Sequence, residues 1–199
     1  MTRRTLAFIF MGLLAVWLVI LFVGIAYFQN QYVVPFSHKA EQFLNASKTE
    51  QWFQRLNNTL PKKNTPLRLI QLWQPGCLCN RFARPHALDT LSLAAEKGIE
   101  HITLIPASQA SAREALQTLN PGTRILVAGN DQINAWPNSP SVMLQGSMGQ
   151  LLYFGPLGFG AFCGQPGTSA LTSQIKAVEN GAQRPFFNVI GQGCFCSFD

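Results

Sequence analysis

The sequence predicts an α/β domain with a mixed sheet flanked by helices, preceded by one N-terminal transmembrane helix. Two observations predict it. Residues 5–27 form an uncharged apolar run, and beyond it strand-like runs alternate with helical patterns before a β-hairpin and a last helix. Strands joined by helices run parallel and hairpin strands run antiparallel, so the sheet is expected to be mixed.

The apolar run is long enough to cross a bilayer, because a spanning helix needs about 20 residues. Arg3 and Arg4 precede it, which places the N-terminus in the cytoplasm and the rest of the chain outside. A cleaved signal peptide is the alternative, but its apolar core is about 7–15 residues long and ends in small residues. This run instead ends at Tyr27 and Phe28. We therefore expect a single-pass anchor in a bacterial inner membrane, with a periplasmic domain.

The remaining elements follow from periodicity and from turn residues. The expected helices cover residues 38–57, 80–97, 108–119 and 169–180, the first capped by Ser37, and the strands cover 67–73, 99–105 and 123–128. Residues 142–145 and 151–154 form the hairpin, and 129–139 a loop. The chain thus divides into an anchor (1–28), a tether with an amphipathic helix (29–65), the α/β domain (66–181) and a Cys-containing tail that packs on it (182–199).

The charge distribution excludes nucleic acid as a partner. Beyond Arg3 and Arg4, 13 basic residues stand against 9 acidic ones, and Lys62-Lys63 is the only basic doublet there. Proteins that bind nucleic acid concentrate basic residues in a patch or stripe.

All five cysteines follow the anchor, where an oxidising compartment permits disulfides. An odd number leaves at least one thiol unpaired, reactive or shared with a metal or another molecule. Two structural disulfides and one remaining thiol are one interpretation. The cysteines are Cys77, Cys79, Cys163, Cys194 and Cys196, and four of them form two C-x-C pairs.

The segment from Trp73 to Pro85 resembles the active-site unit of the thioredoxin-like family. A strand ends at an aromatic residue, a cysteine follows at the start of a helix, and a proline lies inside that helix. The resemblance covers about residues 38–181 and implies that Cys77 is the nucleophile. The family usually has C-x-x-C, whereas this chain has a C-x-C-N motif with Asn80 in the place of the resolving cysteine. Membrane-anchored thioredoxin-like proteins of Gram-negative bacteria have a similar overall pattern.

The position of Cys77 suits an active thiol. A thiolate at a helix N-terminus is stabilised by unpaired N–H groups and by the helix dipole. Arg81 and Arg84 add positive charge, and Gly76 is expected to let the chain bend and keep the sulfur accessible.

Cys79 allows several interpretations. Two residues apart on a helix correspond to a rotation of about 200°, so a direct disulfide between Cys77 and Cys79 requires non-helical backbone. Cys79 is then a labile switch in an unwound turn, a thiol that faces another partner, or a small buried residue or half of a fixed disulfide.

Two later residues are expected near Cys77. The second hairpin strand runs parallel to the strand that ends at Trp73, so the following loop carries Cys163 toward Cys77 as the first candidate for a resolving thiol. A loop staple from Cys163 to Cys194 or Cys196 is the alternative. The resemblance also implies a cis-proline beside the thiol, with Pro140 as first candidate and Trp136-Pro137 as second.

Three functions remain open. The first is a membrane-anchored extracytoplasmic thiol–disulfide oxidoreductase without a cofactor, in which Cys77 attacks and Cys79 or Cys163 resolves. Its partners are extracytoplasmic protein thiols or disulfides and a membrane electron donor or acceptor. The second is the handling of copper or zinc by thiolates, which soft metals prefer, with Cys163, Cys194 and Cys196 as further ligands. The third is a redox-inactive thioredoxin-like binding module.

Overall fold

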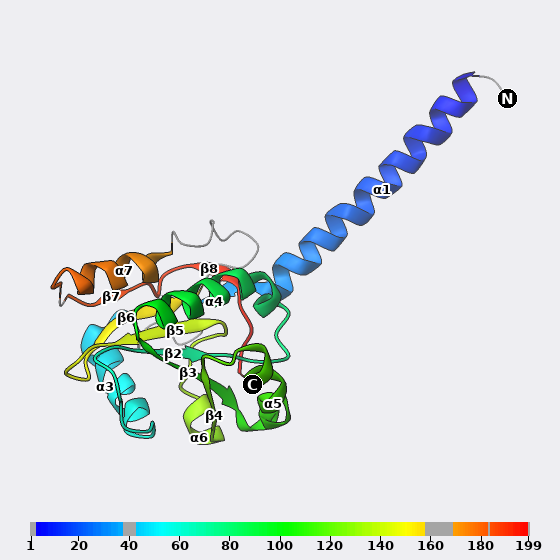
Figure 1. Cartoon of the computed structure of the whole chain (residues 1–199). Coiled ribbons are helices and arrows are strands. Elements are labelled where there is room, and N and C mark those ends of the chain that lie inside the picture. The colour runs from blue at the N-terminus through cyan, green and yellow to red at the C-terminus, as the bar shows by residue number, and fades with distance from the viewer. Residues whose placement is uncertain (1–2, 38–42, 158–168, 183, 199) are drawn as a thin grey trace.

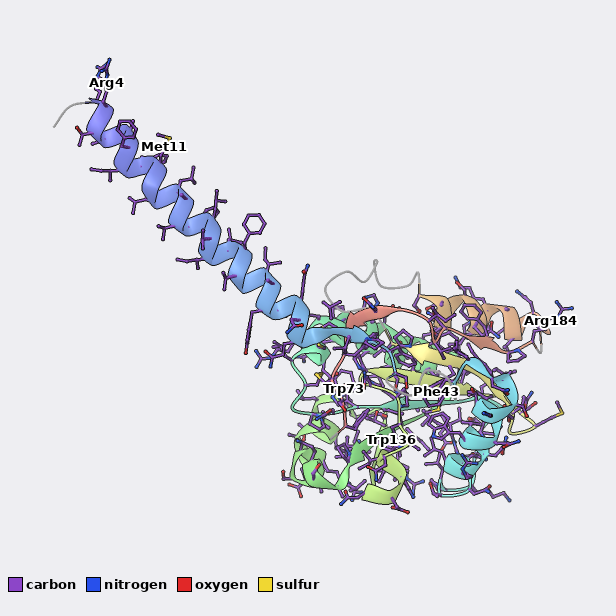
Figure 2. All side chains as sticks on the ribbon, turned by 180° about the vertical axis from the view of Figure 1, so that it is seen from behind. Arg4, Met11, Phe43, Trp73, Trp136 and Arg184 are labelled. Carbon is purple, nitrogen blue, oxygen red and sulfur yellow. A yellow bond between two sulfur atoms is a disulfide. The ribbon has the colours of Figure 1, made fainter. Side chains whose placement is uncertain are left out.

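The computed structural model describes residues 3–37, 43–157, 169–182 and 184–198. Its first helix, α1 (Arg3–Tyr32), projects away from the rest of the protein (Figure 1). Figure 2 shows Arg4 at its far end and Met11 farther along it, whereas Phe43 and Trp136 lie in the domain. The helix is long and apolar enough to cross a membrane, and none of that apolar stretch is buried in the protein.

The domain is built on a six-stranded sheet of order β4-β3-β2-β5-β6-β7. The strands β2 (Arg68–Leu72), β3 (Glu100–Pro106) and β4 (Arg124–Ala128) are parallel. The hairpin strands β5 (Ser141–Gln145) and β6 (Leu151–Pro156) are antiparallel to each other, and β5 pairs antiparallel with β2. The short β7 (Phe186–Phe187) continues parallel to β6. The predicted mixed sheet is therefore confirmed.

Helices cover both faces of the sheet. On one face α4 (Cys79–Glu96) and α7 (Ala170–Glu179) share an apolar cluster with alternate side chains of the central strands. On the other face α3 (Ala46–Asn57) and the short α6 (Asn130–Ile133) pack in a second cluster. After β3 the chain continues through η1 (Ala107–Ala112) and α5 (Arg113–Leu119) to β4. This is the mixed sheet flanked by helices that the thioredoxin-like resemblance implies.

Two predicted elements differ from the structure. The helix α3 begins only at Ala46, where the Asn45 side chain accepts a hydrogen bond of 3.1 Å from the Lys48 amide, so Asn45 and not Ser37 caps it. Residues 38–42 of the predicted helix lie outside the described residues. The predicted loop over 129–139 contains the four-residue helix α6, whose Ile133 is buried in the core.

The C-terminal tail is part of the domain. Its strand β8 (Gln192–Cys194) pairs antiparallel with β1 (Val33–Pro35), the strand that directly follows α1. Phe195 is buried in the core, and Cys196 forms a bridge with Ser139 through two backbone hydrogen bonds of 2.8 and 2.9 Å. Because Phe195 is buried, the two cysteines that flank it are fixed beside the domain.

Candidate functional site

Four cysteines form two disulfides that join the same two segments. Cys77 is bonded to Cys196 and Cys79 to Cys194, with Cα separations of 5.9 and 5.3 Å. The Sγ atoms of Cys77, Cys79 and Cys196 all lie within 4.8 Å of one another. Each cysteine of the C-x-C at the start of α4 is therefore bonded to one cysteine of the C-x-C in the tail.

The chain folds into a turn that sets the two N-terminal sulfurs. The Cys77 amide donates to the Gln74 carbonyl at 3.0 Å, and the Asn80 amide donates to the Cys77 carbonyl at 3.2 Å. Leu78 is the N-cap residue, so Cys77 lies before α4 and Cys79 is its first residue. Since Cys77 is not helical, the opposite directions expected of two helical side chains do not apply, and the two sulfurs lie close together.

The structure corrects the predicted pairing. Cys196, rather than Cys79 or Cys163, is bonded to Cys77, and the alternative staple from Cys163 to Cys194 or Cys196 is not formed. Cys163 itself lies outside the described residues. The pairing depends on β8 lying beside β1, a contact between residues far apart in sequence. The equal spacing of the two C-x-C motifs was a signal of this pairing, because equal spacing lets both bonds form between the same two segments.

A polar network holds the turn that precedes Cys77. The Asn80 side-chain amide donates to the Gln74 carbonyl at 2.6 Å. The Ser139 hydroxyl donates to the Asn80 side-chain oxygen at 3.3 Å and accepts from the Gln74 amide at 3.0 Å. Asn80 and Ser139 are both buried. Asn80 therefore connects the turn before Cys77 to the segment before β5 and holds that turn in place.

The peptide bond between Ser139 and Pro140 is cis, as expected of Pro140 as the first candidate for the cis-proline. Among the described residues no other cis bond is present, so the second candidate, Pro137, is trans. Pro140 directly follows Ser139, whose backbone pairs with that of Cys196. The cis-proline thus lies beside the segment that carries one sulfur of the Cys77–Cys196 disulfide.

The supporting residues lie around the start of α4. Trp73 is half-buried and its amide donates to the Leu104 carbonyl at 2.9 Å, which continues the sheet pattern past β2. Pro85 lies inside α4, and Arg81 is exposed in its first turn. Gly76 differs from the expectation: its φ is not positive, and an added Cβ would meet only the Gln109 side chain at 3.7 Å. The bend before Cys77 therefore does not require glycine. Cys77 is also not accessible as expected, because it is buried and only 6% exposed.

The disulfides also lie where the apolar helix meets the domain. Phe28, near the end of α1, is half-buried and packs against the cluster of Cys77, Cys79 and Cys194. Its ring meets that of Phe82 edge-on, with centroids 6.4 Å apart and an interplanar angle of 88°. The disulfide pair is therefore next to the end of the helix that is long and apolar enough to cross a membrane.

A cavity of about 470 Å³ adjoins Cys77 on the side of α4 and α5. At its floor burial lowers the pKa of His101 to about 4, because the charged ring would lose its hydration. Cys77 is one of the residues that line this cavity.

Comparison with known proteins gives a family. A family model described as "Domain of unknown function (DUF6436)" matches residues 49–198. Similar solved structures include a hypothetical protein from Sinorhizobium meliloti 1021 (18% identity, 67% of this chain and 79% of that one, TM-score 0.48). A second is described as a "Putative Thioredoxin" from Neisseria meningitidis (16%, 59% and 77%, TM-score 0.45). A third is an uncharacterized conserved protein from Geobacillus kaustophilus (16%, 67% and 77%, TM-score 0.46). The search of curated proteins gives no match.

Proposed function

The chain belongs to the DUF6436 family, and we propose that it is a membrane-anchored extracytoplasmic thiol–disulfide oxidoreductase whose redox centre is the Cys77–Cys196 disulfide. The observation that carries the proposal is the presence of two disulfides between the same two segments. When the Cys77–Cys196 bond opens, the Cys79–Cys194 bond still holds the tail at the start of α4. The first bond can therefore open and close while its two sulfurs stay in reach of each other.

The reductive half of the reaction starts from the two thiols. The Cys77 thiolate attacks a disulfide of an extracytoplasmic protein, a new S–S bond forms and one substrate thiolate leaves. The Cys196 thiolate then attacks the Cys77 sulfur, which releases the second substrate thiolate and restores the Cys77–Cys196 disulfide. Two electrons pass from the protein to the substrate, and a membrane donor returns two electrons for the next turnover. The same steps in reverse oxidise a substrate dithiol.

The surroundings favour Cys77 as the attacking thiol. It directly precedes the N-cap of α4, where the positive end of the helix dipole stabilises a thiolate. Arg81 adds a positive charge in the first turn of the helix. Cys196 takes the resolving role expected of Cys79 or Cys163, since it is the residue bonded to Cys77.

The contact with α1 supports a membrane partner. Phe28 packs on the disulfide cluster, so a span formed by α1 would hold the redox centre near the bilayer surface. A donor or acceptor within the membrane would reach the Cys77–Cys196 bond without the domain having to leave the surface.

Turnover of a model protein disulfide, with dithiothreitol as electron donor, tests the assignment on the full chain in bilayer nanodiscs. Cys77→Ala should abolish turnover, and Cys196→Ala, first reduced and then freed of dithiothreitol, should trap a mixed disulfide with the substrate. The paired variant Cys79→Ala with Cys194→Ala leaves the redox pair intact but removes the bond that holds the tail, so turnover should persist at a reduced rate. Undiminished turnover in the Cys77→Ala variant would refute the proposal.

Acid-quenched alkylation of the protein in its native membrane, followed by peptide mapping, tests the redox state directly. The proposal expects Cys77 and Cys196 to divide between thiol and disulfide, and the disulfide fraction to disappear with dithiothreitol. Permanent pairing of all four bonded cysteines favours the redox-inactive binding module instead.

A thiolate metal site is the second candidate, and the sulfur cluster is the observation that favours it. Once reduced, Cys77, Cys79 and Cys196 offer sulfurs within 4.8 Å of one another. Three thiolates in this arrangement suit Cu(I) or Zn²⁺. The metal content of protein purified without chelator, measured together with its free thiols, separates the candidates, because bound metal requires the disulfides to be open.

A further inference from the structure

A second site lies beneath α4. The cavity that adjoins Cys77, here named the α4–α5 pocket, is lined by side chains of α4, α5, β3 and β4, is partly open to solvent, and measures about 470 Å³. Small-molecule sites in proteins typically measure about 300–1,000 Å³. Its walls are apolar and come mainly from the two helices and the strand end at Trp73, with Leu88, Leu91, Leu116 and Leu119 among the lining residues.

The floor of the α4–α5 pocket is polar, although it belongs to the inside of the domain. Ile102 and Leu104 of β3 point to the apolar cluster under α3, so His101 and Thr103 point to the opposite face, where they line the pocket. Thr123, just before β4, lines it as well. Under most helices such positions carry apolar residues, because burying a polar group without a partner is unfavourable.

His101 is the group at this floor that lacks a partner. Its side chain is buried, and within the described residues neither ring nitrogen has a hydrogen-bond partner. The Thr103 and Thr123 hydroxyls lie 3.2 Å apart, and the Thr123 hydroxyl donates to the His101 carbonyl at 3.3 Å, so both hydroxyls are engaged. A neutral imidazole offers one donor and one acceptor. A hydroxyl or carbonyl group of a bound molecule would form a hydrogen bond with the His101 ring.

The charges at the pocket are all of one sign. Among the described residues that line it, only Arg81 and Arg84, separated by one helical turn on α4, are charged. Both are exposed, and within the described residues neither forms an ion pair. Arginine binds carboxylates through paired N–H donors. The site therefore combines a positive rim, apolar walls and a neutral polar floor.

We propose that the α4–α5 pocket binds a small organic acid with an aliphatic or aromatic body. Its carboxylate pairs with Arg81 and Arg84, the body lies between α4 and α5, and a hydroxyl at the far end bonds to His101. This inference rests on the pocket alone and does not depend on the redox chemistry of Cys77.

Calorimetric titration of the full chain in bilayer nanodiscs tests the proposal with a series of phenylalkanoates and 4-hydroxyphenylalkanoates. Empty nanodiscs and the corresponding carboxamides are the blanks. One saturable site is expected for the acids, with no binding of the amides and tighter binding of the hydroxylated members. Absence of saturable binding by every acid up to about 10 mM, or equal binding of acids and amides, would overturn the proposal.

Three variants locate the bound acid. Replacing both rim arginines, Arg81→Gln with Arg84→Gln, should weaken binding by about tenfold or more, because two charge-assisted hydrogen bonds are lost. Arg113→Gln removes an exposed arginine of α5 that does not line the pocket, and it should leave binding unchanged. An equal loss in the Arg113 variant would mean that general positive charge attracts the acid, which would also overturn the proposal.

His101→Leu should remove the preference for the hydroxylated acids while leaving the domain at least as resistant to unfolding, because it deletes an unpartnered buried polar group. A merely structural histidine would not change the ratio of the two affinities. A retained preference for the hydroxylated acids in this variant would refute the placement of the hydroxyl at His101.

Discussion

The two disulfides can be removed singly and together, which measures whether they constrain the chain as one link. The variants are Cys77→Ala with Cys196→Ala, Cys79→Ala with Cys194→Ala, and the combination of all four. Either disulfide alone closes a loop of more than a hundred residues, since the bonded pairs are 119 and 115 residues apart. Both close nearly the same loop.

The loop lengths give the expected magnitudes. Closing a loop of this length lowers the entropy of the unfolded chain by the equivalent of about 5 kcal/mol. Once one disulfide exists, the other closes only a small ring through the two C-x-C segments. The same dependence of chain entropy on loop length gives about 2 kcal/mol for closing this ring. Removing one disulfide should therefore lower the free energy of unfolding by about 2 kcal/mol, and removing both by about 7 kcal/mol. Additive effects would give about 4 kcal/mol, so the coupling is about 3 kcal/mol.

The free energy of unfolding can be measured by urea titration of the full chain in bilayer nanodiscs, followed by tryptophan fluorescence. Trp17→Phe removes the signal of the apolar helix, and Cys163→Ser prevents exchange with the fifth cysteine. Replacing either pair also removes packing contacts. This loss is the same whether or not the other disulfide is present, so it cancels in the coupling. Additivity within about 0.5 kcal/mol would refute the reasoning, because it would mean that the two bonds constrain separate parts of the unfolded chain.

Three further predictions concern buried polar groups, each measured by urea unfolding. Asn80→Ala should lower the free energy of unfolding by about 1–3 kcal/mol, because it removes the acceptor of the buried Ser139 hydroxyl and one of the two donors to the Gln74 carbonyl; no loss would contradict the network. Burial lowers the folded-state pKa of His101 to about 4, so the unfolded chain binds the proton at higher pH than the folded one, and stability is full above pH 6.5. As the pH falls from 6.5 to 4 about 3 kcal/mol should be lost, and His101→Leu should remove this dependence. Glu100→Gln should cost about 3–5 kcal/mol because it breaks the 2.9 Å ion pair of the buried Arg68, whereas a change below about 1 kcal/mol would show that the pair is solvated.

Local sequence patterns were enough to predict most of the secondary structure. The strand at 67–73 and the helix at 80–97 are β2 and α4 within one or two residues, and the hairpin has the predicted strands. The helix expected over 38–57 is interrupted at Asn45: residues 43–44 are helical, and the side chain of Asn45 caps a new helix that starts at Ala46. The spacing of apolar residues predicts that a helix is present, but it does not show which residue caps its N-terminus.

The site was predicted less completely. The pattern of residues along the chain placed Cys77 at the start of a helix, and the resemblance to the thioredoxin-like family implied the cis peptide at Pro140. The partner of Cys77 required the tail, and Cys196 reaches it because β8 pairs with β1 and Phe195 is buried in the core. Periodicity describes neighbours a few residues apart, whereas this contact joins positions that are 119 residues apart.

The apolar run at residues 5–27 and the alternation of strands and helices were determined by the sequence alone, because hydropathy and periodicity are properties of adjacent residues. The pairing of the four cysteines and the polar floor of the α4–α5 pocket were decided only by the tertiary structure. His101 and Thr103 lie in a strand that reads as apolar, and only the packing of α4 and α5 over that face leaves a cavity above them. Such features depend on which surfaces meet, and that is set by the whole fold rather than by any single segment.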